Sequence, residues 1–168
     1  GTPSTDWTEA PLTDLIHHIE QTHHTYLRGE LPRLDGLLTK VTRVHGHDQP
    51  WLRTAKRTFD DLATDLYAHM EKEETVVFPY IQTLECEGAV PPPDDLGADP
   101  VALMEDEHDE AGNALKKLQA LSNDFSVPPE ACGTLRATIN GMRLLQKDTF
   151  QHVHKENNIL FRRARALM

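Results

Sequence analysis

The stretch His69-Met-Glu-Lys-Glu73 places an imidazole four residues before a carboxylate. On an α-helix, residues four apart lie on the same face, about 6 Å apart, so such a pair can bind one metal ion. The same spacing returns near the C-terminus in His152-Val-His-Lys-Glu156. A single pair of this kind is usually a solvated ion pair. Two copies in one small helical chain favour a metal site, for which the remaining residues are the scaffold.

The hydrophobic pattern predicts four helices and no strand. Apolar residues keep a helical period in four segments, at about residues 11–45, 51–84, 100–121 and 130–168. Pro32 predicts a kink or break in the first helix, and Pro79 predicts a kink near the end of the second. We therefore expect an all-α, up-down-up-down four-helix bundle over residues 11–168, preceded by a flexible tail at residues 1–10.

Composition limits the possible partners. The chain has 168 residues and a formal net charge of −10, which argues against nucleic acid because phosphate binding needs a basic face. No apolar run is long enough to span a membrane, and no signal peptide is visible. Cys86 and Cys132 lie far apart, outside any Cys-x-x-Cys motif, which indicates a reducing compartment such as the cytoplasm.

A depth comparison adds one histidine from each of the other two helices. With a rise of about 1.5 Å per residue, one layer of an antiparallel bundle, roughly 12–18 Å from one end, holds all the candidate ligands. They are His24, His69, Glu73, His108, His152 and Glu156. Four imidazoles and two carboxylates are too many for one structural zinc; they suit two iron or manganese ions with bridging carboxylates.

Several neighbouring residues are weaker candidates. His23 adjoins His24, and the helical period predicts that one of the two faces the core and the other faces water. His45 lies 21 residues after His24, roughly 30 Å along a straight helix, so it fails the depth comparison. Asp65 and Glu107 are each an acceptor for a ligand imidazole N–H, a residue that gates access to the metals, or an exposed carboxylate.

Longer motifs resemble a known family over nearly the whole chain from Pro11 onward. This family is the hemerythrin-like domain of the iron–sulphur cluster repair di-iron proteins, the repair of iron centres group. The matching segments are 24–28 with 30–32, 40–45, 69–74 with 77–79, 104–112, 128–132, and 152–158 with 160–161.

The resemblance implies a non-haem site with two iron ions in a four-helix bundle. Its ligands are expected at His24, His69, His108 and His152, with Glu73 and Glu156 as bridging carboxylates. It also implies repair of iron–sulphur clusters damaged by nitric oxide or oxidative stress, with damaged or apo iron–sulphur proteins as partners. Family members usually carry an N-terminal domain with a Cys-Cys pair. No cysteine precedes Pro11 here, which leaves open a removed domain or a stand-alone form.

Two other functions stay open at this stage. One is a di-iron reductase of nitric oxide or peroxide; the other is a hemerythrin-type module that binds or senses oxygen or nitric oxide. Oxygen carriage is the weaker alternative because the carrier pattern has a second histidine four residues after His108, where this chain has Gly112.

Overall fold

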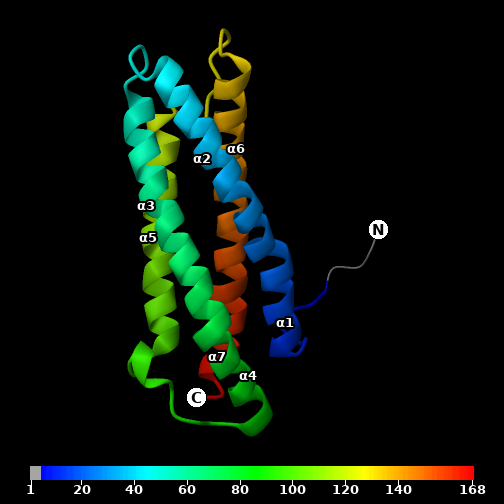
Figure 1. Ribbon diagram of the computed structural model, residues 1–168. Coiled ribbons are helices and arrows are strands. Elements are labelled where there is room, and N and C mark those ends of the chain that lie inside the picture. Colours follow the sequence, from blue (N-terminus) through cyan, green and yellow to red (C-terminus); the bar gives the residue numbers. More distant parts are fainter. Residues whose placement is uncertain (1–4) are drawn as a thin grey trace.

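Four long helical segments run antiparallel and form a bundle in the computed structural model, which describes residues 5–168 (Figure 1). Helix α2 (Thr25–His45) packs against α3 (Trp51–Lys72) and α6 (Gly133–Lys155), while α5 (Pro100–Leu121) packs against α3 and α6. These contacts close a ring of four helices. The predicted all-α four-helix bundle is confirmed.

Shorter helices extend three of these segments at one end of the bundle. Helix α1 (Leu12–Ile19) precedes α2, α4 (Phe78–Glu87) follows α3, and α7 (Phe161–Arg165) follows α6. Figure 1 shows α1, α4 and α7 at the end opposite the turn between α2 and α3. The connection from α4 to α5 contains a single 3₁₀ turn, η3 (Asp94–Leu96).

A π-helical turn interrupts each of the three extended segments. These turns are η1 (Glu20–His24), η2 (Glu73–Val77) and η4 (Glu156–Leu160). Of the two alternatives predicted at Pro32, a kink or a break, the break does not occur, because α2 continues through this proline to His45; the proline side chain lies on the solvent face. In the second segment the π turn η2 ends two residues before Pro79, which lies in the first turn of α4.

Capping side chains set where α5 and α6 begin. Asp99 accepts a hydrogen bond from the Ala102 amide at 2.9 Å and precedes Pro100, a favourable first residue of a helix. Cys132 caps α6, so this helix begins at Gly133 rather than near the predicted residue 130. Within residues 5–168, no helix combines the length and apolar character needed to cross a bilayer.

A buried polar layer divides the hydrophobic core into two clusters. The larger cluster includes Leu27, Met70, Ala111 and Leu145, and the smaller includes Ile19, Val77, Met104 and Leu160. On every long segment the buried histidines and glutamates fall between members of the two clusters. The polar layer therefore lies between two apolar cores.

Part of the predicted tail, residues 1–4, lies outside the described residues. Residues beyond it contact the bundle: the Arg163 guanidinium donates to the backbone carbonyls of Trp7 at 2.7 Å and Ala10 at 2.6 Å. The flexibility of residues 1–10 stays a prediction.

Candidate metal centre

The π-helical turns lie where the candidate ligands lie. His24 ends η1, Glu73 begins η2 and Glu156 begins η4. A π turn changes the angle between successive side chains on a helix and is frequent at functional sites. Here it lets the chain point consecutive or closely spaced polar residues inward while the helix continues.

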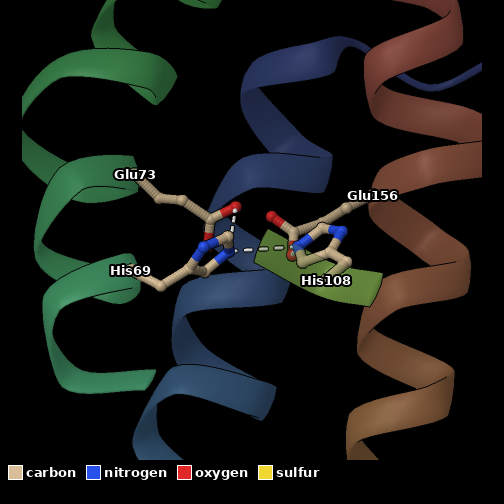
Figure 2. A group of neighbouring side chains, drawn as sticks. All are labelled: His69, Glu73, His108 and Glu156. Carbon is tan, nitrogen blue, oxygen red and sulfur yellow. Dashed lines mark hydrogen bonds and ion pairs between the residues drawn. The ribbon is translucent and has the colours of Figure 1, made fainter. Parts of the chain in front are cut away.

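Four of the six predicted ligands converge at one place, here called the four-residue position: His69, Glu73, His108 and Glu156 (Figure 2). The His69 Nε2 atom lies 3.4 Å from Glu73 Oε2 and 3.0 Å from His108 Nε2. His108 Nε2 lies 3.2 Å from Glu156 Oε1. The His69–Glu73 pair thus lies on α3 and η2, and the His108–Glu156 pair joins α5 to η4.

The remaining two ligands form a three-residue position with Glu73, which both positions share: His24, Glu73 and His152. His24 Nε2 lies 3.1 Å from Glu73 Oε1, and His152 Nε2 lies 4.0 Å from the same oxygen. His152 Nε2 is also 2.7 Å from Glu156 Oε1. The structure therefore brings together all six residues that the sequence singled out.

The protonation pattern of the four-residue position fits a cation. His69 Nδ1 is 3.0 Å from Glu107 Oε1, and His108 Nδ1 is 2.7 Å from Asn157 Oδ1. Both partner oxygens accept, so both Nδ1 atoms donate. In the neutral imidazoles the two Nε2 atoms then present lone pairs to each other at 3.0 Å. Such an arrangement is repulsive unless a positive charge, either a proton or a metal ion, lies between them. Burial acts to lower the pKa of His108, but the negative charge of the nearby Glu156 raises it above its ordinary value, so this position attracts either cation.

Buried atoms without hydrogen-bond partners point to the same conclusion. Within residues 5–168 they include Glu73 Oε2, both carboxylate oxygens of Glu156, and His152 Nε2. His152 Nε2 and Glu156 Oε1 lie 2.7 Å apart, but their relative orientation makes no hydrogen bond. Buried polar atoms are almost always paired, because an unpaired one costs free energy. Four such atoms in one layer, all of them possible ligand atoms, fit one or two bound cations. Nitrogen and oxygen donors in this mixture suit iron, manganese or zinc.

Burial shifts the pKa values of these groups. It raises the pKa of Glu73 well above its ordinary value, and the negative charge of Glu156 adds to that rise. Against the opposing effect of burial, His152 holds the pKa of Glu156 well below its ordinary value. Burial, with the nearby His152, lowers the pKa of His24 to about 4, which keeps this imidazole neutral and able to donate a lone pair at neutral pH.

Glu107 is the acceptor for His69 that the sequence left open. It also accepts from Lys72 Nζ at 2.6 Å. The hydrogen bond from His69, together with Lys72, lowers the pKa of Glu107 to about 2 despite its partial burial. Asp65, the other carboxylate considered, lies on the wall of a neighbouring pocket and is exposed.

The prediction that one of His23 and His24 faces water is wrong, because His23 is as buried as His24. Its Nδ1 atom lies 3.0 Å from Asp148 Oδ1, its Nε2 atom accepts from Lys155 Nζ at 2.8 Å, and its ring stacks on His152 with centroids 5.1 Å apart. The prediction that one of the pair faces water assumed a regular helical period. The π turn η1 invalidates that assumption.

Other histidines lie away from the site. His45 Nε2 is 3.3 Å from Cys132 Sγ, at the start of α6 and beside the turn at the opposite end of the bundle. His154 is exposed. Both cysteines are exposed and unpaired.

A pocket of about 580 Å³ opens beside the site, between α3, α5 and α6. Its lining includes His69, His108 and His152, and its carboxylates include Asp61, Asp65, Glu107 and Glu110. Small molecules and hydrated cations can therefore reach the ligand histidines from solvent.

Known proteins match this chain over almost its full length. The hemerythrin HHE cation binding domain family matches residues 15–164. The iron-sulfur cluster repair protein YtfE of Cronobacter sakazakii is 41% identical over 162 residues, which cover 96% of this chain and 69% of that protein. The proteins of the same name from Escherichia coli O81 and Escherichia fergusonii are 38% identical over 161 residues, covering 96% of this chain and 70% of each. The predicted resemblance is confirmed: the chain belongs to the hemerythrin HHE cation binding domain family, among relatives named as iron–sulphur cluster repair proteins.

Proposed function

We propose that the buried layer binds two iron ions, one at the four-residue position and one at the three-residue position. The ligands are His24, His69, His108 and His152, with Glu73 and Glu156 as bridging carboxylates. The observation that carries this proposal is the shared carboxylate: Glu73 Oε1 faces His24 at 3.1 Å, and Glu73 Oε2 faces His69 at 3.4 Å. A carboxylate between two histidine sets is the arrangement that di-iron bundles use.

The chain repairs stress-damaged iron–sulphur clusters by supplying iron from this site to damaged or apo iron–sulphur proteins. Relatives that are 38–41% identical carry the name iron-sulfur cluster repair protein. Histidine-rich iron beside a solvent-facing pocket suits release, because imidazole ligands compete poorly with thiolates for iron in a cluster. The stress signal is nitric oxide or oxidation, and the expected compartment is the cytoplasm.

An iron-transfer assay tests this function. The chain is loaded anaerobically with ferrous iron, freed of excess metal, and mixed with an apo-ferredoxin, sulphide and a thiol reductant. Cluster formation is followed by visible circular dichroism, with a chelator present that removes free iron. We expect cluster formation that depends on the loaded chain. No cluster above the level seen with unloaded chain contradicts the proposal.

The pocket favours a second candidate function, a di-iron reductase of nitric oxide or peroxide, because it leads small molecules to His69, His108 and His152. Sustained consumption of nitric oxide or peroxide over many turnovers, with an electron donor, is the result expected of a reductase. Reversible binding of oxygen or nitric oxide without turnover is expected of a sensing module.

A further inference from the structure

The two cation positions share their carboxylates and differ in their histidines. Glu73 contributes to both positions, and Glu156 Oε1 lies 3.2 Å from His108 Nε2 and 2.7 Å from His152 Nε2. With both carboxylates bridging, any difference in how tightly the two ions are held lies in the histidines.

The two positions differ in what the outer ring nitrogen, Nδ1, of their histidines contacts. His69 and His108 each donate the outer N–H to a side-chain oxygen, Glu107 Oε1 at 3.0 Å and Asn157 Oδ1 at 2.7 Å. Such partners orient a ligand imidazole and increase its basicity, and losing one typically costs about 10–100-fold in metal affinity. Both histidines of the four-residue position are therefore oriented by a hydrogen bond from their outer N–H group.

His24 lacks such a hydrogen bond. Its buried Nδ1 atom has no hydrogen-bond partner among residues 5–168. The nearest carboxylate oxygen, Glu74 Oε2, lies 3.6 Å away, beyond hydrogen-bond length. Glu74 is instead held by Arg28, whose Nη1 and Nη2 donate to its two oxygens at 2.9 Å and 2.6 Å. This two-bond pairing holds the carboxylate just short of the imidazole.

We propose that the two positions hold iron unequally, and that iron is given up from the three-residue position because Arg28 keeps Glu74 away from His24. This inference rests on the proposed iron-donor function and adds to it the identity of the donated iron. Arg28 and Glu74 are positioning residues, since neither contacts the cation position directly. Removing Arg28 frees Glu74 to accept the His24 N–H and so tightens the weaker position.

The test measures how fast ferrous iron leaves the loaded chain. Protein holding about two irons per chain is mixed anaerobically with excess of a chromophoric ferrous chelator, and absorbance is followed. Release in two phases of equal amplitude is expected, the first about tenfold faster or more. His24→Ala removes the fast phase, and Asn157→Ala accelerates the slow one.

Arg28→Gln is the decisive variant, and we expect it to slow the fast phase by about tenfold while leaving the slow phase unchanged. Arg33→Gln is the matched control. Arg33 lies on the same helix, is exposed and pairs with Glu30, away from the site. Thermal melts of the iron-free variants show that both are folded, so a change confined to one phase reports positioning of His24.

Release of both irons at one rate in the unmodified chain overturns the inference, and so does an unchanged or accelerated fast phase in Arg28→Gln. Release of iron in two phases without transfer to apo-ferredoxin contradicts the proposed donor function. That result still supports the unequal binding of the two irons. A chain that takes up no iron overturns both.

Discussion

The Nδ1 atom of His69 lies 3.0 Å from Oε1 of Glu107, and Lys72 holds the other oxygen of that carboxylate at 2.6 Å. A carboxylate fixed in this way sets the tautomer and the ring orientation of a ligand histidine. It also stands on the wall of the pocket that leads to the site. Glu107 is thus placed to influence iron affinity without contacting iron.

Replacing Glu107 with alanine should weaken ferrous iron binding by about 10–100-fold, because His69 loses the acceptor that orients it. Glu107→Gln keeps an oxygen acceptor, so its ferrous iron affinity should lie between that of the unmodified chain and that of Glu107→Ala. Affinity is measured by competition with a chelator of known ferrous affinity. Glu110→Ala, on the exposed face of the same helix and lining the same pocket, is the control. Equal losses in the Glu107 and Glu110 variants would show a general electrostatic effect instead.

Glu73→Gln should abolish iron binding at both positions and at the same time stabilise the iron-free fold at pH 7. The pKa of Glu73 is raised in the folded state, mainly by burial. Above its ordinary pKa the folded state then binds more protons than the unfolded state, so stability falls as pH rises. An amide has no such cost. The free energy of unfolding of the iron-free variant should therefore rise by about 1 kcal/mol or more at pH 7, roughly 2–4 °C in melting temperature.

This gain should disappear near pH 4, where the carboxyl group is protonated in both states. Thermal melts of iron-free protein at the two pH values measure it. The control is Glu71→Gln, an exposed carboxylate two residues away that should change little. A lower melting temperature for Glu73→Gln at pH 7 contradicts the assignment of a destabilising buried charge.

His23→Ala should destabilise the fold by about 1–3 kcal/mol, because it leaves Asp148 and Lys155 without their partner. Iron content should stay near two per chain. His24→Ala should instead lose iron from the three-residue position. Chemical denaturation and elemental analysis separate the two effects, with exposed His17→Ala as the control. If His23→Ala halves the iron and His24→Ala does not, the ligand has been assigned to the wrong histidine.

His45→Ala should keep about two irons per chain, although the family motif includes this residue. Its imidazole contacts Cys132 at the start of α6, beside the turn at the far end of the bundle. Elemental analysis of the reconstituted variant checks this prediction. A drop to one iron or none would mean that the first helix rearranges when metal binds.

The sequence predicts the bundle and the six converging residues because both depend on regular helical spacing. Apolar residues at a 3.6 period define the helices, and the rise per residue places His24 and Glu73 at one depth. What the sequence does not predict depends on departures from that spacing. The π turn at residues 20–24 buries His23, and no proline or glycine within that segment signals it.

The outer contacts are equally difficult to predict. Glu107 was an open alternative because a carboxylate next to a ligand is most often solvated. Its role follows from the contact with His69 on a different helix, which no spacing rule reports. Asn157 presents the same difficulty: its oxygen meets His108 across two helices. Long-range pairs of this kind become visible only when the helices are packed.

The most direct test of the central claim is the metal content of the chain, by elemental analysis after anaerobic reconstitution and desalting. It should be compared between the intact chain, Glu73→Leu and the exposed control Glu71→Leu, with circular dichroism to show that each is helical. We expect about two irons per chain in the intact protein and in the control, and almost none in Glu73→Leu. A single zinc, or a metal content that Glu73→Leu leaves unchanged, would contradict a di-iron centre bridged by Glu73.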